Sequence, residues 1–292
     1  MAKSKVASPG HKLGQTVGVV LQNVLKGPLT DFAARNGLYC DSQGNRPGVR
    51  PGKKVTWNDL RGNQHDLDYV LERGGTATDR GKPVAFIEIA WRRYTKHSRN
   101  KSGELEGALL PLAVAYPSVR FLGVVLAGEY SGGGIQQLRS AGIELLAIPF
   151  ETIKAAFASQ GIRIDYPEKA GAKEKAMLNR ALGSLTPRKL EKISRPIWNA
   201  IKNEFAGFES RLSALVNIST CRVRIITLFG FEQEYTSIEA AIQALSTEDG
   251  TLKPQAGETQ GYEAFVNFAS GSSITGRFKT KDELLRFLRQ VA

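Results

Sequence analysis

The chain of 292 residues is poor in the residue types that build metal–thiolate sites and disulfide frameworks. It contains two cysteines, Cys40 and Cys221, and three histidines. The cysteines lie far apart, and neither has a Cys or His partner at the spacing of a zinc site. Two distant cysteines also exclude a small scaffold held together by disulfides. We therefore expect a reducing, cytoplasmic location for this protein.

The sequence also lacks long hydrophobic runs and is short of acidic residues. No apolar run approaches the roughly 18 residues that a membrane span needs, and residues 1–12 lack the apolar segment of a signal peptide. Lys and Arg number 40 against 28 Asp and Glu, a formal net charge of +12. Such an excess favours a polyanionic partner, and without a membrane span we expect nucleic acid. The alternative is a basic protein without such a partner.

Hydrophobic periodicity predicts alternating helices and strands in the first part of the chain. Residues 11–36 have a helical pattern that Gly27-Pro28 is expected to interrupt, and residues 41–54 form a basic loop rich in Gly and Pro. Strands are expected at 54–60, 66–72, 83–91, 121–128 and 143–150, and helices at 98–115, 133–142 and 151–161. The first two strands are spaced as a hairpin, and the later order favours parallel crossovers. The expected fold class is α/β (α+β), with a mixed central sheet flanked by helices.

The pattern changes after residue 165. The polar segment 165–177 is the expected linker. We therefore expect a first domain at residues 1–168 and a smaller C-terminal α+β domain at 177–292. The strands of the second domain carry several basic residues and no obvious set of catalytic acids. These basic residues are Arg222, Arg224, Arg277 and Lys279.

One carboxylate, Glu88, stands in the middle of the apolar segment 85–90. Asp66 and Asp68 stand two apart on the preceding strand, where residues i and i+2 share a face. If the two strands lie side by side, Asp68 and Glu88 reach one face at one depth. Two converging carboxylates suit Mg²⁺, with Asp66 as a second-choice ligand. Such an ion polarises a phosphoryl oxygen and lowers the pKa of bound water. Alternatively, Asp66 caps a turn, and Glu88 faces water or pairs with an arginine.

A cationic segment, "WRRYTKHSRNK" at residues 91–101, follows this strand. It interleaves aromatic and basic residues, which is typical of a nucleic-acid contact surface. The alternative is a solvated loop that leads into a helix. The side chains expected to contact DNA are Arg92, Arg93, Tyr94 and Arg99.

The order of elements resembles the PD-(D/E)xK nuclease superfamily, home of many type II restriction endonucleases. The matching residues are "LDYVL", which carries Asp68, and "AFIEIAW", where Glu88 takes the acid position of the E-x-K element. The resemblance covers about residues 10–160. It implies a restriction-endonuclease-like core, Mg²⁺ as cofactor and double-stranded DNA as substrate. Cutting both strands at a symmetric site calls for two active sites, so it also implies a homodimer. The added domain would supply sequence recognition or dimer contacts.

The sequence departs from the superfamily pattern at the lysine of the E-x-K element, where it has Ala90. A lysine from a nearby element would then replace it, and the candidates are Lys96, just past the strand, and Lys101. Arginine is a poor base because it stays protonated. Glu104 and Glu106 would orient that lysine, add a metal ligand or form a solvated helix face.

Two alternatives to a type II restriction enzyme follow from the same residues. The first is a structure-specific nuclease of the same superfamily that acts on branched or damaged DNA, as in repair or junction processing, or on RNA. The second is a non-catalytic DNA-binding protein on a decayed nuclease fold, which the alanine at position 90 favours.

Overall fold

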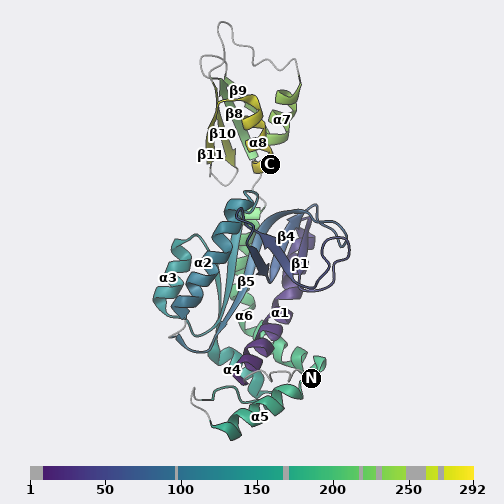
Figure 1. Cartoon of the computed structure of the whole chain (residues 1–292), viewed down its shortest axis with the longest axis vertical. Coiled ribbons are helices and arrows are strands. Elements are labelled where there is room, and N and C mark those ends of the chain that lie inside the picture. Colours follow the sequence, from purple (N-terminus) through teal and green to yellow (C-terminus); the bar gives the residue numbers. More distant parts are fainter. Residues whose placement is uncertain are drawn as a thin grey trace. The chain divides into compact units, whose positions relative to one another are not determined.

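The structure is a computed structural model that describes residues 9–95, 98–166, 171–216, 220–227, 232–247, 261–268 and 273–292. These residues form two compact units, Met1–Ser213 and Ala214–Ala292 (Figure 1). The N-terminal residues 1–8 and the candidate lysine Lys96 lie outside the described residues. No helix among the described residues is both long and apolar enough to cross a membrane.

The first unit is built on a five-stranded mixed sheet with the order β1-β4-β5-β6-β7. Its strands are β1 Leu38–Ser42, β4 Tyr69–Arg73, β5 Lys82–Arg92, β6 Phe121–Gly128 and β7 Glu144–Pro149. The pairs β1·β4 and β4·β5 are antiparallel, whereas β5·β6 and β6·β7 are parallel. The expected mixed sheet is therefore confirmed. Strand β1 was not predicted, because its short sequence LYCDS has no alternation of apolar and polar residues.

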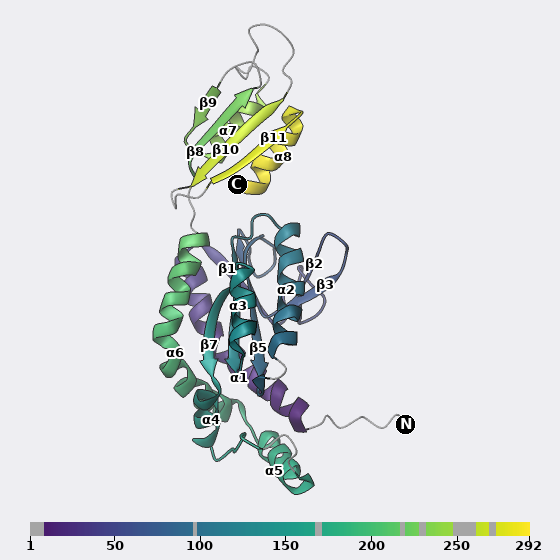
Figure 2. The same ribbon diagram turned by 90° about the vertical axis from the view of Figure 1, so that its left-hand side faces the viewer.

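In the described part of the first unit, six helices accompany this sheet. They are α1 Pro9–Arg35, α2 Ser98–Ala115, α3 Gly132–Ser140, α4 Phe150–Ala158, α5 Ala172–Gly183 and α6 Pro187–Val216. Helices α2 and α3 cover one face, where Leu109 and Leu138 join a core cluster with Phe86 of β5 (Figure 2). Helices α1 and α6 lie on the other face, where the ring of Phe208 is 5.1 Å from that of Phe121. The expected helices on both sides of the sheet are confirmed.

Helix α1 runs without a break through Pro28, although the Gly-Pro pair was expected to interrupt it. Proline removes one backbone donor and crowds the preceding turn. Here Leu25 and Leu29, on either side of Pro28, are both 1% exposed, and Phe32 is buried in the next turn. Burial of this apolar face stabilises the helix enough to carry it past the proline.

The hairpin before β4 forms a separate two-stranded sheet of β2 Val55–Asn58 and β3 Gln64–Leu67. The side chain of Asp59 accepts hydrogen bonds from the backbone N–H groups of Arg61 and Asn63 at 2.8 and 2.9 Å and so closes the turn. The strand expected at 66–72 is divided. It bends at Asp68, so β3 and β4 belong to different sheets.

The two units divide at residues 213 and 214, later than the boundary expected near 168–177. Part of the expected linker is helix α5, whose Asn179 carbonyl accepts a hydrogen bond from Lys12 of α1 at 3.1 Å. Helix α6 packs on the first sheet through Phe208, whose ring contacts that of Phe121, and its Leu212 is buried. Both helices therefore belong to the first unit, since α6 packs on its sheet and α5 packs on α1.

The second unit has an antiparallel sheet of order β11-β10-β8-β9 with two helices. Its elements are β8 Thr220–Thr227, β9 Glu232–Tyr235, α7 Ile238–Ser246, β10 Tyr262–Phe268, β11 Ser273–Phe278 and α8 Lys281–Val291. Val223, Ala264 and Leu284 belong to its own apolar core. The expected α+β character is confirmed, although strand β9 was not predicted.

Candidate active site

Asp68 and Glu88 lie side by side where strands β4 and β5 meet. In this antiparallel pair Tyr69 stands opposite Ile87, so the register continues to Asp68 opposite Glu88. The backbone N–H of Asp68 also forms a hydrogen bond to the Glu88 side chain. The structure thus brings together the two carboxylates that the sequence predicted to lie at the same level of neighbouring strands. Their role as metal ligands stays a prediction.

The Asp68 carboxylate is held from two sides. Its Oδ1 accepts a hydrogen bond from the Gln22 side chain at 2.6 Å, and its Oδ2 accepts one from the Ile89 backbone N–H at 2.7 Å. Burial raises the pKa of Asp68, while these two hydrogen bonds and the charge of Lys101 oppose the rise. A carboxylate held in this way has a fixed orientation, and each oxygen keeps a lone pair for a further ligand.

Gln22 was not recognised in the sequence as a site residue. It lies on α1 between Leu21 and Val24, which are both buried, and its backbone carbonyl accepts a hydrogen bond from the Tyr69 hydroxyl at 2.5 Å. The only sequence signal is a polar residue within an apolar helix segment, and that pattern does not say what the residue contacts.

Glu88 is the most perturbed acid of the site. Burial raises the pKa of its carboxyl well above the usual range, the neighbouring Asp68 charge raises it further, and Lys101 lowers it. Its Oε1 atom is buried and has no hydrogen-bond partner among the described residues. A buried oxygen without a partner costs about 1–3 kcal/mol and is uncommon in folded proteins. A cation placed beside Glu88 would give that oxygen a partner and would relieve its repulsion with Asp68.

Lys101, in the first turns of α2, is a lysine whose charge acts on both acids. Its charge lowers the pKa of Asp68 and of Glu88 alike. Its Nζ donates to Glu104 at 3.0 Å, and its side chain is 26% exposed. Glu104 therefore orients this lysine. Glu106 instead accepts a hydrogen bond from Gln137 of α3 at 2.8 Å, which joins the two helices.

Ala90, at the expected lysine position, belongs to the apolar core. Its side chain is 1% exposed in the cluster that includes Leu105 and Leu126, and its carbonyl accepts a hydrogen bond from the Tyr130 hydroxyl at 3.0 Å. A lysine here would have to enter the packed layer beneath α2. Lys101 on α2 instead lines a cavity beside Asp68, and its charge acts on Glu88.

Asp66 does not join the two central acids. Its carboxylate accepts hydrogen bonds from Lys54 at 2.5 Å and from Thr56 at 2.7 Å, which lowers its pKa, and its side chain is 45% exposed. The expectation that Asp66 and Asp68 share a face fails because the chain bends at Asp68. The i, i+2 rule applies within one strand, and these residues flank a bend between two sheets.

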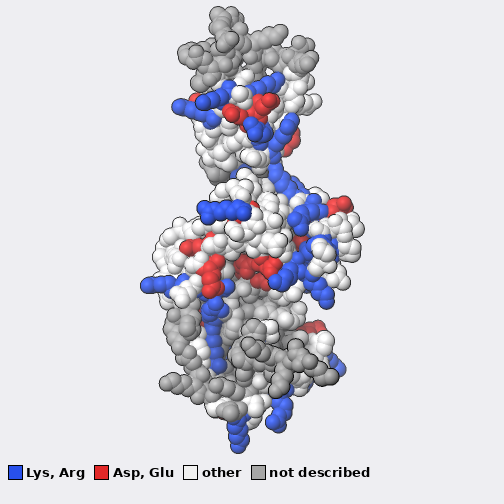
Figure 3. Space-filling view, in the orientation of Figure 1, with Lys and Arg blue, Asp and Glu red and all other residues white. Residues whose placement is uncertain are grey.

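Two cavities lie next to Asp68. The first, which we call the arginine cavity, has a volume of about 520 Å³ and includes Arg92, Arg93 and Lys101 in its lining. The second, which we call the amide cavity, has a volume of about 450 Å³ and extends between α1 and the loop after β1. Gln22 and Asp68 line both. Figure 3 shows Lys and Arg side chains around a small acidic area of the first unit.

The predicted DNA contacts divide into two groups. Arg92 and Arg93 line the arginine cavity beside the acids. Tyr94 is not part of that lining; its hydroxyl donates to the Tyr166 carbonyl at 3.2 Å, and its ring lies 5.1 Å from the Arg93 guanidinium. Arg99 is exposed on α2 and does not line the cavity either. The structure therefore places two of the four predicted contacts in a cavity that Asp68 also lines.

The carboxylates are suited to an ion that needs few protein ligands. No group of three or more His, Cys, Asp and Glu residues that could hold a metal ion is found in the described part of the chain. Mg²⁺ typically keeps several waters and binds through one or two carboxylates plus phosphate oxygens. Asp68 and Glu88, with the unpartnered Oε1 of Glu88, fit that requirement.

Three arginine side chains on the strands of the second unit form ion pairs within their own sheet. The three ion pairs are Arg222 with Glu234 at 3.5 Å, Arg224 with Glu232 at 3.0 Å, and Arg277 with Glu263 at 2.9 Å. Each arginine charge is therefore balanced by a neighbouring carboxylate. This sheet face does not supply the excess positive charge of the chain.

Comparisons with known proteins do not assign a family. No family model matches this chain, and no curated protein matches it. A crystal structure titled as that of a protein of unknown function, AF1548, matches 64% of this chain and 99% of its own, with 13% identity and a TM-score of 0.29. A likeness at that score is too weak to assign a fold or an activity.

Proposed function

We propose that this protein is a Mg²⁺-dependent DNA endonuclease. The observation that carries the proposal is the pair Asp68 and Glu88, opposed on neighbouring strands with the charge of Lys101 acting on both. Burial raises the pKa of both acids, and acids with raised pKa values cluster at functional sites. The basic side chains of the arginine cavity supply contacts for a phosphodiester backbone.

The residues of this site have separate roles in the hydrolysis of a phosphodiester. A bound Mg²⁺ would supply Lewis-acid activation of the phosphate and of water. Asp68 and Glu88 would hold that ion, while Gln22 and the Ile89 N–H keep the Asp68 carboxylate in place. Lys101, oriented by Glu104, stabilises the negative charge that develops on the phosphate oxygens.

The finer reading is a type II restriction enzyme with a restriction-endonuclease-like core that acts as a homodimer on double-stranded DNA. Two features support it. A helix, a bent strand carrying Asp68 and a strand carrying Glu88 are followed by helix, strand, helix and strand in the superfamily order. The charge of Lys101 also acts on Glu88, as that of a lysine displaced from position 90 would. A structure-specific nuclease would share these features and differ in its substrate.

A non-catalytic DNA-binding protein is the second candidate, and Ala90 is the observation that favours it. The position of the E-x-K lysine is occupied by a buried alanine. Under this reading Arg92 and Arg93 would bind the DNA backbone, and the two acids would be remnants. The two functions differ in metal-dependent cleavage and not in DNA binding.

The test is cleavage of long unmethylated DNA and of supercoiled plasmid by the purified full chain, with Mg²⁺ or with a chelator. We expect Mg²⁺-dependent products from the wild type and their loss in Glu88→Gln and Lys101→Met. Discrete bands would indicate sequence-specific cutting. Glu106→Gln is the matched control, because Glu106 lies on the same helix as Lys101 and bonds to Gln137 outside the site.

DNA binding by the same variants, measured by fluorescence anisotropy without divalent ions, separates loss of chemistry from loss of affinity. Glu88→Gln should bind DNA at least as tightly as the wild type, since it removes a negative charge. Intact DNA in both Mg²⁺ and Mn²⁺ would refute the proposal for these substrates. Cleavage that persists in Glu88→Gln would refute the assigned site.

A further inference from the structure

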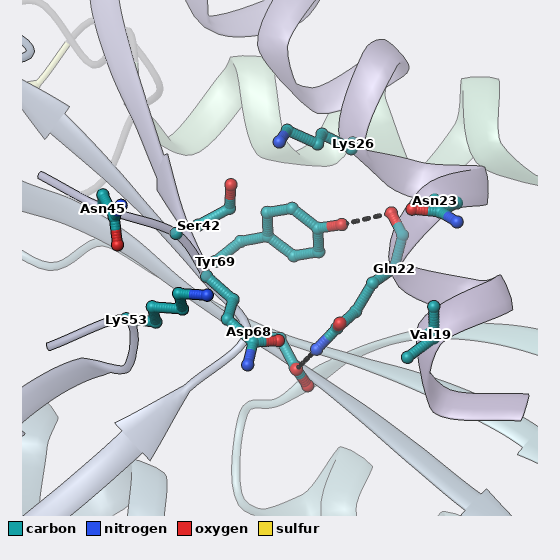
Figure 4. Close-up of a pocket in the computed structure, with 11 residues that line it drawn as sticks. Val19, Gln22, Asn23, Lys26, Ser42, Asn45, Lys53, Asp68 and Tyr69 are labelled. Atoms are coloured by element: carbon teal, nitrogen blue, oxygen red, sulfur yellow. Dashed lines mark hydrogen bonds between the residues drawn. The ribbon is translucent and has the colours of Figure 1, made fainter. Parts of the chain in front are cut away.

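The amide cavity is not needed to explain the acid pair, yet it opens directly beside it. Asp68 and Tyr69 lie on one side of it, and α1 contributes Asn23 and Lys26 (Figure 4). Its volume of about 450 Å³ is within the range of roughly 300–1,000 Å³ that holds small ligands. Amide and lysine side chains dominate its lining, so the cavity is suited to a polar, anionic ligand.

The loop after β1 forms the opposite wall and is held in place by two buried arginines. Arg50 donates to the backbone carbonyls of Ser42 at 2.9 Å and Gly44 at 3.1 Å, and to the Asp41 carboxylate at 2.5 Å. Arg46, which is 2% exposed, donates to Asp41 at 2.7 Å and to Glu72 at 2.8 and 2.9 Å. These bonds hold the loop backbone in one conformation.

The side chains that this loop presents are free to contact a ligand. Asn45 and Lys53 line the cavity and are exposed. They stand on a backbone that Arg46 and Arg50 anchor from below, so little conformational entropy of the loop is lost when they bind. Figure 4 shows Lys26 and Lys53 approaching the cavity from different elements, with Tyr69 between them and Asp68 close by.

We propose that the amide cavity binds one nucleotide of the DNA strand next to the scissile phosphate; this inference rests on the proposed nuclease function. Because Asp68 and Gln22 line both cavities, a strand whose phosphate lies at the acids extends from the arginine cavity into the amide cavity. Lys26 and Lys53 contact the phosphate of this nucleotide. The amides of Asn23 and Asn45 contact the edge of its base.

The two kinds of side chain predict different effects. Lysine contacts to phosphate carry no sequence information and make affinity depend on salt. Asn amides can donate and accept at one base edge, and the pattern that they match best is that of adenine. The amide cavity should therefore provide both general affinity for DNA and a preference for one base beside the cut.

The test compares Lys53→Ala and Asn45→Ala with Lys202→Ala, a control at an exposed lysine of α6. Binding of fluorescein-labelled single-stranded and duplex oligonucleotides is measured by anisotropy, without divalent ions and at several salt concentrations. We expect Lys53→Ala to weaken binding several-fold for every sequence and to reduce the magnitude of the salt slope by about 1. Lys202→Ala should change neither quantity.

Cleavage of a substrate pool with randomised positions around the cut gives the second readout. We expect Asn45→Ala to reduce the preference at one position beside the cut by about tenfold, whereas Lys202→Ala should leave that preference unchanged. If the protein cleaves DNA while both variants keep wild-type affinity, salt slope and base preference, the inference is overturned. If it does not cleave but Lys53→Ala alone weakens oligonucleotide binding, the proposed function fails and the DNA-binding cavity is supported.

Discussion

The buried ion network beneath β1 and β4 gives a stability prediction that does not depend on function. The Arg46 guanidinium donates to the carboxylates of Asp41 and Glu72 and to the backbone carbonyls of Thr76 and Asp79, at 2.7–3.0 Å. Glu72 is 0% exposed. One side chain thus joins two strands and two loops that are distant in sequence.

Arg46→Ala would leave the buried Glu72 side chain without its ion-pair partner. Asp41 would keep its pair with Arg50 at 2.5 Å, whereas Glu72 would retain the hydrogen bond from the Gly81 N–H at 2.8 Å. Removing one partner of a buried ion pair destabilises a protein by about 3–5 kcal/mol. Since domains are stable by only about 5–15 kcal/mol, we expect the variant to lose about a fifth or more of its stability.

Urea unfolding monitored by tryptophan fluorescence measures this loss. All three tryptophans, Trp57, Trp91 and Trp198, lie in the first unit, so the signal reports that unit alone. The control is Arg163→Ala, since Arg163 and Asp165 form an exposed pair at 2.8 Å, and such pairs contribute about 0–1 kcal/mol.

The double variant Arg46→Met/Glu72→Met tests the physical reason for the loss. It removes both charges and should recover part of the stability lost in Arg46→Ala, because no carboxylate remains unpaired in the core. A loss in Arg46→Ala of less than about 1 kcal/mol, within the range of the exposed control, would refute the reasoning. A double variant less stable than Arg46→Ala would also contradict it.

Three further predictions concern the candidate site. Burial and the charge of Asp68 raise the pKa of Glu88 in the folded state. In the unfolded chain a glutamate has a pKa of about 4.3, so above that pH the charged Glu88 carboxylate destabilises the folded state. In metal-free buffer, Glu88→Gln should therefore be more stable than the wild type to urea at pH 8 by about 1–2 kcal/mol, with the difference disappearing near pH 4; a gain that does not change with pH would contradict this. Mg²⁺ should raise the wild-type Tm, more at pH 8 than at pH 6, and should not raise that of Glu88→Gln; equal shifts in both proteins would place the ion elsewhere. Gln22→Ala removes a hydrogen bond that lowers the pKa of Asp68, so cleavage should slow by about 10- to 100-fold. The acid limb of the pH–rate profile should also move to higher pH. An unchanged profile would show that Gln22 does not act through Asp68.

The sequence determined the local elements and the pairing of the two acids. Strand periodicity predicted that Asp68 and Glu88 reach one depth if their strands are neighbours, and the register of β4 and β5 agrees. Most predicted helices and strands lie within a few residues of their expected positions. These features depend on side-chain patterns between near neighbours in sequence, which a single chain shows directly.

The tertiary structure decided the features that depend on distant parts of the chain. Asp66 is separated from the acids by a bend that periodicity does not show, and Gln22 reaches Asp68 across 46 residues. Arg46 lies in a basic loop rich in Gly and Pro, and that composition is typical of a solvated loop. The Arg46 side chain is nevertheless buried, because it pairs with Glu72, 26 residues later in the sequence. Burial of a charge depends on a partner that only the packed chain brings into place, so composition alone could not separate the buried arginines from the exposed lysines of the same loop.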